Sequence, residues 1–386
     1  MNKLISLSFI NTLNERLKSK NGLLQVILGP RQVGKTTTVI KFLQDNYKDQ
    51  SLYYSADAIF NATPEWVLEI WNKALVEEKI LVIDEIQKCQ NWAEVIKKLY
   101  DEAKRKNHLT KVVLLGSSSL EIQKGLTESL TGRFQLLQVA HWNYEESLLG
   151  YKLDFETYLK YGGYPGSYQF INKKNDKDWI NYVKNSIIST VIEKDILQFQ
   201  NIKNPSLFKQ AFEVIMAYPA QEISYTKLLG LLQDKGNVEL VKYYLKIYEG
   251  AFLVKTLEKY SAKKIKTKAS SPKIVPMAPC FYYLNIQDKY SDSERGRVFE
   301  ALVGSQLIKT GEDVYYWREK NDEVDFILKK GKKIWAIEVK SGYKKSSKGL
   351  IAFKNQFKDA KVVYIDLENY FEFEKSPLDF LENNSV

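Results

Sequence analysis

The feature that most constrains this chain is an apolar run that leads directly into a glycine-rich loop. Residues 23–28 are apolar except for Gln25, which is typical of a buried strand. The loop after them has the spacing Gly-x-x-x-x-Gly-Lys-Thr, and residues 37–44 are compatible with a helix. In that context the glycines let backbone N–H groups surround a phosphate, and the start of the helix adds positive charge. The sequence therefore predicts a site for a nucleoside triphosphate, with ATP as the expected nucleotide.

The residues expected to hold the nucleotide are consecutive in the chain. They are Gly29, Pro30, Arg31, Gln32, Val33, Gly34, Lys35, Thr36 and Thr37. The Lys35 ammonium can reach the β- and γ-phosphates, and the Thr36 hydroxyl can ligate Mg²⁺. We therefore expect Lys35 to act in catalysis, Thr36 to be a metal ligand, and Mg²⁺ to be the cofactor that accompanies ATP.

Two acidic residues follow a second apolar run. Residues 80–83 are Ile-Leu-Val-Ile, and they lead directly into Asp84 and Glu85. This pattern suits a buried parallel strand whose carboxyl end faces the nucleotide. At that position Asp84 is expected to hold Mg²⁺, and Glu85 is expected to polarise the water that attacks the γ-phosphate.

A third strand-like run, residues 111–115, is apolar after Lys111 and leads into Gly116 and three serines. A polar side chain at this strand end can lie between the γ-phosphate and the attacking water. We favour Ser118 for this catalytic role, and Ser117 is the alternative. The competing interpretation is a plain turn or a helix cap.

Arg133 follows this region in the segment Leu-Thr-Gly-Arg-Phe. An arginine here could neutralise charge that develops on the transferred phosphoryl group, either within the chain or in a neighbouring subunit of a homo-oligomer. A structural salt bridge is the competing interpretation.

The composition of the chain limits which partners and which cellular compartment we expect. The 57 Lys and Arg residues exceed the 47 Asp and Glu residues, which gives a net charge of +10 and favours a polyanionic partner such as DNA. The cysteines, Cys89 and Cys280, and the histidines, His108 and His141, are isolated, so a disulfide framework or a zinc site is not expected. No segment reads as a signal peptide or a membrane span, so we expect a cytoplasmic protein with no membrane partner.

In their order, these motifs resemble prokaryotic AAA-type P-loop ATPases that carry a C-terminal domain of the DUF4143 type. The segment Gly162-Gly163-Tyr164-Pro165 matches a turn that follows the ATPase core in that family, and Asp195 lies where the family has an acid. The resemblance covers nearly the whole chain. It implies an ATPase core at residues 1–150 and a nuclease-like DUF4143 domain at residues 270–386.

Between these parts we expect a helical lid or connector at 151–203 and a winged-helix-like domain at 204–269. Residues 207–217, 225–233 and 238–249 read as three helices, and a strand and a lysine-rich hairpin with Lys263, Lys264, Lys266 and Lys268 follow. Lys242 and Lys246 on the third helix could contact phosphates without reading sequence. A purely structural connector is the alternative.

The last third of the chain carries a set of acids with a lysine. Residues 297–309 read as a helix with Glu300, and two strands of a hairpin carry Asp325 and Glu338. Lys340 lies two residues beyond Glu338, on the same strand face. Glu300, Asp325 and Glu338 could hold Mg²⁺, and Lys340 could orient water or stabilise negative charge during phosphodiester hydrolysis. This set resembles the PD-(D/E)xK nuclease superfamily. Two interpretations of this domain stay open: an active nuclease and an inactive nuclease-like binding domain.

The predicted fold class is α/β: an AAA-type P-loop core, a helical lid, a winged helix and a C-terminal restriction-endonuclease-like domain. The predicted function is Mg²⁺-dependent ATP hydrolysis that drives conformational change in a nucleic-acid-associated machine. Whether the C-terminal domain is also a metal-dependent nuclease stays open. The alternative is an ATP-controlled switch that binds a protein partner and has an inactive nuclease-like scaffold.

Overall fold

The computed structural model describes residues 5–117, 120–172, 175–197, 200, 202–232, 237–261, 270–286, 291–340 and 348–385. The chain divides into two compact units. The first comprises Met1–His141 and Lys184–Asn201, and the second comprises Trp142–Val183 and Ile202–Val386. This division is coarser than the predicted four parts, whose boundaries stay a prediction.

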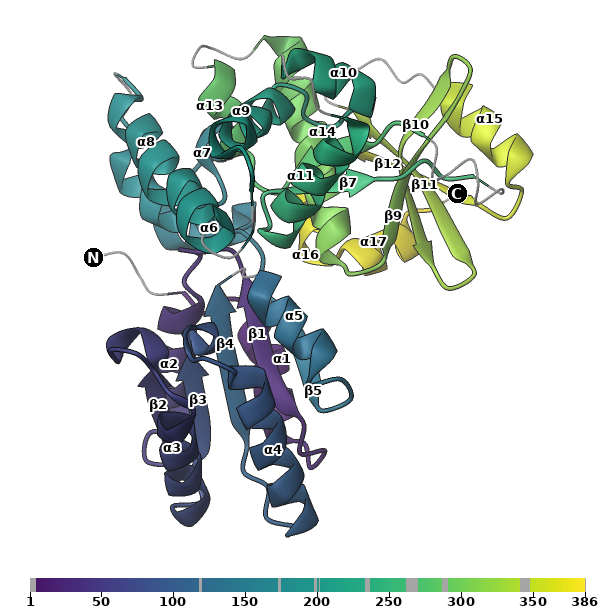
Figure 1. The fold of residues 1–386 in the computed structure, drawn as a ribbon. Coiled ribbons are helices and arrows are strands. Elements are labelled where there is room, and N and C mark those ends of the chain that lie inside the picture. The colour runs from purple at the N-terminus through teal and green to yellow at the C-terminus, as the bar shows by residue number, and fades with distance from the viewer. Residues whose placement is uncertain are drawn as a thin grey trace. The chain divides into compact units, whose positions relative to one another are not determined.

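The first unit is built on a parallel sheet of five strands in the order β2-β3-β4-β1-β5 (Figure 1). The strands are β1 (Leu24–Gly29), β2 (Ser51–Ser55), β3 (Ile80–Asp84), β4 (Val112–Ser117) and β5 (Phe134–Gln138). Strands β1, β3 and β4 are buried along their whole length because they occupy the centre of the sheet. The α/β class predicted for this part of the chain is confirmed.

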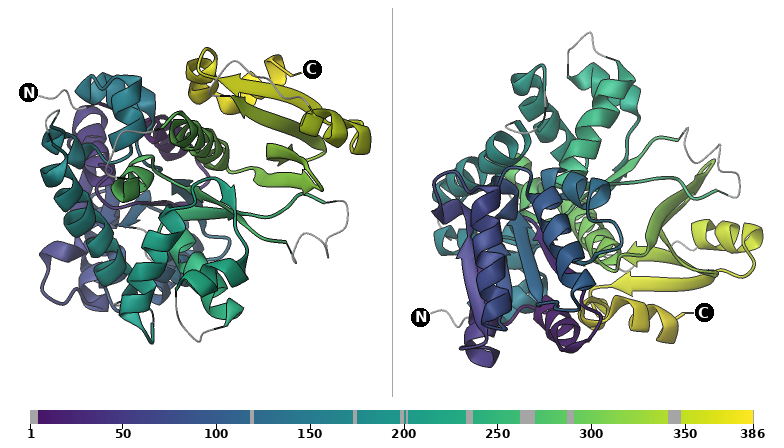
Figure 2. Two further views of the ribbon diagram at one scale, coloured as in Figure 1. Left: turned by 90° about the horizontal axis from the view of Figure 1, so that it is seen from above. Right: turned by 60° about the horizontal axis from the view of Figure 1, so that its bottom comes forward.

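One helix precedes these strands and the others connect them. They are α1 (Phe9–Lys18), α2 (Lys35–Asn46), α3 (Pro64–Val76), α4 (Trp92–Arg105) and α5 (Leu120–Glu128), with short helices η1 (Ala56–Ala58) and η2 (Ile86–Lys88). Right-handed crossovers place α2 on one face of the sheet and α3, α4 and α5 on the other. The packing agrees, since α1 contacts α2 and β5 whereas α3 contacts α4 (Figure 2). The carboxyl ends of the strands therefore form the edge at which a ligand can bind.

The next segment is mostly helical. It contains α6 (Tyr144–Tyr151), α7 (Phe155–Tyr161), η3 (Pro165–Phe170), α8 (Lys177–Asn181) and two π-helices, η4 (Tyr182–Ile188) and η5 (Val191–Leu197). Helix α6 begins at a capping box in which the Asn143 side chain accepts from the Glu146 N–H and the Glu146 side chain accepts from the Asn143 N–H. The buried Glu374 carboxylate also accepts from the N–H groups of Tyr144 and Glu145, at 3.0 Å each.

Three helices and a small antiparallel sheet follow. The helices are α9 (Pro205–Met216), α10 (Tyr225–Leu231) and α11 (Val238–Gly250), and the strands are β6 (Gln221–Glu222), β7 (Val254–Leu257) and β8 (Lys273–Pro276) in the order β6-β8-β7. Strand β8 lies beyond the predicted boundary at residue 269. The winged-helix assignment stays a prediction, and the four predicted hairpin lysines lie outside the described residues.

The C-terminal part contains a four-stranded sheet in the order β12-β11-β10-β9. Its elements are α13 (Cys280–Ile286), α14 (Asp292–Lys309), β9 (Asp313–Glu319), β10 (Asp322–Lys330), β11 (Lys333–Lys340), α15 (Lys348–Gln356), β12 (Lys361–Asp366), α16 (Tyr370–Lys375) and α17 (Pro377–Asn383). Side chains alternate between two buried clusters. Phe326 and Ile337 join the cluster that contains α14 side chains, whereas Ile327 and Ala336 join the cluster that contains Phe353 of α15. The restriction-endonuclease-like assignment stays a prediction.

None of the helices within the described ranges combines the length and the apolar character that crossing a membrane requires.

Candidate active site

The glycine-rich loop connects the end of β1 to the start of α2. Gly34 precedes α2 with a φ of 87°, a left-handed conformation that glycine adopts without strain. The side chain of Lys35 then turns back into the loop, where its Nζ donates to the carbonyl oxygens of Gly29 at 2.9 Å and Pro30 at 2.7 Å. The loop therefore holds a buried ammonium group at the amino end of a helix, where both charges favour a phosphate.

The other loop residues complete this turn. Gly29 is paired in register with Ser117 of β4, Val33 is buried, and Thr37 lies in the first turn of α2. Gln32 has a φ of 58°, and its Nε2 donates to the carbonyl oxygen of Ser186 at 3.0 Å. The predicted roles of Pro30, Arg31 and their neighbours in nucleotide binding stay predictions.

Asp84 ends β3 beside the start of α2. Its Oδ2 accepts from the Thr36 hydroxyl at 2.8 Å and from the Tyr53 hydroxyl of β2 at 2.8 Å. Burial and the Asp84 carboxylate raise the pKa of Tyr53 well above its ordinary value, so the phenol stays protonated and donates. The structure thus brings the two predicted Mg²⁺ ligands of this site within hydrogen-bond distance of each other.

Glu85 follows Asp84 with a φ of 51° and leaves the line of the strand. Its Oε2 accepts from the Ser117 hydroxyl at 3.2 Å and from the Gln87 side-chain amide. Ser117 and Gln87 are both buried. The polar group that the structure describes at the tip of β4 is therefore Ser117, whereas Ser118, the favoured candidate, lies outside the described residues.

Arg133 lies at the other edge of the sheet. Its carbonyl oxygen accepts from the N–H of Leu24, the first residue of β1, whereas the phosphate loop begins at Gly29, the last residue of that strand. Its guanidinium forms a bidentate ion pair with Asp101, at 2.7 and 2.9 Å. The fold separates Arg133 from the loop of its own chain by the length of β1, about 17 Å at 3.3 Å per residue. The ion pair with Asp101 agrees with the competing interpretation, a structural salt bridge. A role of Arg133 in a neighbouring subunit stays a prediction.

The second candidate site lies on the C-terminal sheet. Antiparallel pairing of Phe326 with Ile337 places Asp325 opposite Glu338. The Asp325 Oδ2 accepts from the Val339 N–H at 2.8 Å, and the Glu338 Oε1 accepts from the Lys340 ammonium. A register shift against β9, between Val324 and Ile327, displaces β10 at this position. Asp325, Glu338 and Lys340 therefore lie together, as predicted from their strands.

Glu300 has a different partner. It forms an ion pair with Lys273 of β8, whose Nζ also donates to the Asp325 carbonyl oxygen at 3.0 Å and lies 4.6 Å from the centre of the Phe326 ring. Although burial disfavours the Lys273 ammonium, Glu300 and Asp325 raise the pKa of Lys273 above its ordinary value. Lys273 is thus a charged residue that sequence reasoning did not assign to this site.

The three predicted carboxylate ligands do not form one cluster. Within the described ranges, no three His, Cys, Asp or Glu side chains group closely enough to hold a metal ion. Glu300 pairs with Lys273 of β8, whereas Glu338 pairs with Lys340 of its own strand. Burial, together with Asp325, raises the pKa of Glu300 and of Glu338 to about 7 each, although a lysine opposes the rise in both cases. The Glu338 Oε2 is buried without a hydrogen-bond partner among the described residues.

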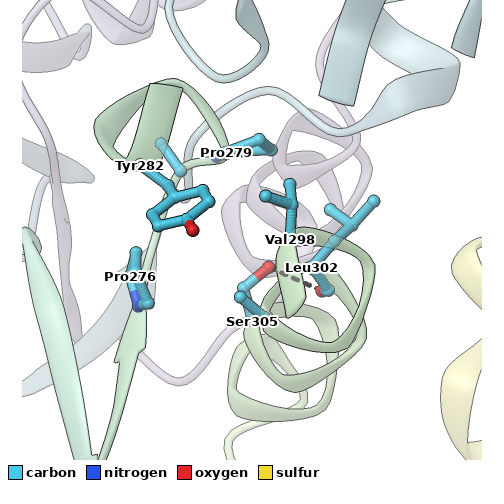
Figure 3. Close-up of a pocket in the computed structure, with 8 residues that line it drawn as sticks. Pro276, Pro279, Tyr282, Val298, Leu302 and Ser305 are labelled. Carbon is cyan, nitrogen blue, oxygen red and sulfur yellow. Dashed lines mark hydrogen bonds between the residues drawn. The ribbon is translucent and has the colours of Figure 1, made fainter. Parts of the chain in front are cut away.

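A small cavity lies elsewhere in the second unit (Figure 3). The residues labelled along its wall are Pro276, Pro279, Tyr282, Val298, Leu302 and Ser305, and its volume is about 10 Å³. The Ser305 hydroxyl donates to the Leu302 carbonyl oxygen at 2.8 Å instead of pointing a free group into the cavity. This space holds at most about one water molecule, so it is not a ligand site.

The parallel sheet, the phosphate loop and the acidic end of β3 together define the first unit as a P-loop nucleoside triphosphatase. Comparison with protein families agrees and makes the class more specific. Residues 21–148 match the model described as AAA domain, and residues 295–378 match the domain of unknown function DUF4143. Residues 152–277 match another domain of unknown function, DUF8612. The chain is therefore an AAA-type P-loop ATPase with a C-terminal DUF4143 domain, which confirms the resemblance inferred from its motifs.

Several solved structures are similar at low identity. The Walker-type ATPase PABY2304 of Pyrococcus abyssi is 13% identical with a TM-score of 0.49, over 74% of this chain and 96% of that one. The RuvB Holliday junction branch migration motor of Thermotoga maritima is 15% identical with a TM-score of 0.31, over 64% and 88%. The Orc1 protein of Aeropyrum pernix, solved in complex with DNA, is 11% identical with a TM-score of 0.31, over 78% and 93%. No curated protein has a significant sequence match to the chain.

Proposed function

We propose that this protein hydrolyses ATP with Mg²⁺ at the loop of residues 29–37, and that hydrolysis drives conformational change in a nucleic-acid-associated machine. One observation carries the hydrolytic part. The Thr36 hydroxyl lies 2.8 Å from the Asp84 carboxylate, and the next residue, Glu85, is anchored beside them. A metal ligand pair and a general base thus adjoin the loop that binds phosphate.

The oxygen donors of Thr36 and Asp84 fit Mg²⁺, which prefers oxygen ligands and retains several waters. Bound with ATP, the ion would neutralise charge on the β- and γ-phosphate oxygens. Lys35 would exchange its loop carbonyl partners for phosphate oxygens, and the N–H groups at the start of α2 would orient the phosphates. Glu85 would accept a proton from the attacking water.

The nucleic-acid part of the proposal rests on charge and on the C-terminal acids. The net charge of +10 favours a polyanion, and contacts through lysine would be independent of sequence. Lys242 of α11 pairs with Glu239 at 2.8 Å and lies 5.4 Å from the centre of the Tyr225 ring, so a phosphate would compete with partners inside the protein. In a nuclease, Asp325 and Glu338 would hold Mg²⁺ and Lys340 would stabilise negative charge on the phosphodiester.

A specific observation favours a second candidate function. Glu300 and Glu338 are each paired with a lysine, so two of the three acids are neutralised within the protein itself. A neutralised site suits a nuclease-like scaffold that does not cut. In that case ATP occupancy would control binding to a protein partner or to another copy of the chain.

The test measures ATP turnover in wild-type protein, Lys35→Ala and Glu85→Gln, each with and without double-stranded DNA. We expect Lys35→Ala to lose nucleotide binding, and Glu85→Gln to bind ATP with turnover nearly abolished. Normal turnover in Glu85→Gln would refute the hydrolytic assignment. DNA stimulation would support the nucleic-acid machine, and cleavage lost in Lys340→Ala would add nuclease activity. If DNA neither stimulates turnover nor is cleaved, and the protein captures a defined partner only with ATP, the switch is favoured.

A further inference from the structure

We propose that Gln87 is a positioning residue for ATP hydrolysis and that it acts through Glu85. The inference rests on the proposed function, because it assigns Glu85 as the general base. Gln87 lies in η2, two residues after Glu85, and no motif in the sequence marks it as part of the site.

The contacts form a closed triangle of three side chains. The Gln87 Nε2 donates to the Glu85 Oε2 and, at 3.4 Å, to the Ser117 Oγ, while the Ser117 Oγ donates to the same Glu85 Oε2 at 3.2 Å. Within the described part of the chain, no hydrogen bond reaches the other carboxylate oxygen, Glu85 Oε1. Two donors thus fix one oxygen of the general base, and the other oxygen remains available to a water molecule.

The orientation of the Gln87 amide follows from its partner. If the amide were turned over, its oxygen would face the Glu85 carboxylate, and two acceptors would repel each other. As it is placed, the Gln87 Oε1 is buried and has no hydrogen-bond partner among the described residues. A leucine of similar volume would fill this space without leaving a buried acceptor unpaired. Packing therefore does not account for the amide, whereas its donation to Glu85 does.

The surrounding backbone leaves room for this amide. A Cβ atom at Gly116 would lie 2.9 Å from the Gln87 Oε1 and 1.8 Å from the Ile122 Cδ1. The absence of a side chain at Gly116 lets the Gln87 amide lie against the end of β4 while it donates to Glu85. Gln87 is 8% exposed and Ser117 is 2% exposed, so both donors to Glu85 are buried.

Anchoring matters because a free glutamate side chain samples several rotamers and loses that freedom only at an entropic cost. A general base works when its oxygen is within hydrogen-bond reach of the proton that it removes. Gln87 and Ser117 hold the Glu85 carboxylate in one position before ATP binds, as supporting residues do when they preorganise a catalytic group. The effect is confined to the chemical step, since the described contacts of Gln87 are to Glu85 and Ser117 and not to the phosphate loop.

The test compares ATP binding with turnover in Gln87→Leu and Gln87→Glu, which keep the size of the side chain. We expect Gln87→Leu to lower kcat by about tenfold or more, the effect of losing a hydrogen bond to a charged group, while KM and the Kd for ATP change by less than about twofold. Gln87→Glu should lower kcat further, because two carboxylates would then face each other. The exposed Gln90→Leu is the matched control and should behave as wild type.

Wild-type protein and Glu85→Gln are measured alongside, so that two failures can be told apart. If Glu85→Gln keeps normal turnover, the proposed hydrolytic function is wrong and the role of Gln87 is wrong with it. If Glu85→Gln is inactive but Gln87→Leu turns over ATP at the wild-type rate, only the role of Gln87 is overturned. A parallel loss of kcat, ATP affinity and thermal stability in Gln87→Leu would also overturn it, because that pattern indicates a structural role.

Ser117→Ala is the second variant, and it decides the question should Gln87→Leu fail to fold. It removes the other donor to the same oxygen and leaves only a small space. A lower kcat at unchanged ATP affinity supports the triangle of side chains. An unchanged kcat shows that anchoring of the Glu85 Oε2 is not needed and refutes the proposal.

Discussion

Lys273→Met removes the partner of Glu300 inside the second unit and keeps a side chain of nearly the same length. The Lys273 side chain is 8% exposed and that of Glu300 is 22% exposed, so the remaining carboxylate would be largely buried without a counter-charge. Breaking a buried ion pair from one side costs about 3–5 kcal/mol. Because Glu300 keeps some contact with water, we expect the lower end, about 3 kcal/mol. Methionine still covers the Phe326 ring, so lost packing adds little.

Hydrogen exchange is the suitable assay, since the chain has two compact units and a single unfolding transition cannot be assumed. Peptides from β10 and β11 should exchange about a hundredfold faster in Lys273→Met, because each 1.4 kcal/mol is about a factor of ten. Peptides from β1 and β4 serve as an internal reference. At pH 8 Glu300 is ionised in the wild-type protein, because its pKa there is raised to about 7, and the loss of Lys273 raises this pKa further in the variant.

Two further variants isolate the cause of the change. Lys255→Met on β7 is the matched control, since this lysine is 47% exposed and 3.7 Å from Glu249, and it should cost at most about 1 kcal/mol. The double variant Lys273→Met with Glu300→Leu should recover most of the protection, because no unpaired charge remains. Less than threefold faster exchange in Lys273→Met would refute the reasoning.

Three other predictions concern the first unit. Thr36→Val should lower kcat by about ten- to hundredfold in a turnover assay, because it removes an oxygen that pairs with Asp84; an unchanged rate would count against this site. Burial raises the pKa of Cys89 to about 11, so a thiol reagent should label it slowly at pH 7.5 and rapidly in urea, and rapid labelling of native protein would contradict its burial. Arg133→Ala should lower stability by at most about 1 kcal/mol, since the pair with Asp101 is partly exposed. Because Arg133 lowers the pKa of Asp101 below its ordinary 3.8, this contribution should be complete above about pH 4 and disappear on acidification, and a melting-temperature difference that persists at pH 2 would refute it.

The ATPase core could be predicted from the sequence because its signals are local. A buried strand, a glycine loop and the start of a helix are contiguous around Lys35. The apolar run that ends in Asp84 likewise predicts a buried strand by itself. The neighbouring strands were harder to anticipate, because periodicity does not tell which strands pair. The order of the sheet, which brings Gly29 beside Ser117, became visible only in the fold.

The residues that were missed owe their contacts to the folded path of the chain. Lys273 pairs with Glu300 on another element, and nothing in the pattern around either residue indicates that pairing. Gln87 lies in a short helix whose path depends on the left-handed turn at Glu85. Tyr53 could have been noticed as a polar aromatic near a strand end, but its bond to Asp84 depends on the pairing of β2 with β3. Tertiary partners of this kind are not encoded by spacing along the chain.

The division of the chain into units has a consequence for any attempt to take the protein apart. The chain passes from one unit to the other at residues 141–142, 183–184 and 201–202. A fragment that stops at residue 141 would contain every strand of the parallel sheet and still lack Ser186, whose carbonyl oxygen holds the Gln32 side chain of the phosphate loop. Cleavage or truncation after residue 141 would therefore not release the whole first unit, because the chain supplies residues 184–201 of that unit only after it has built part of the other one.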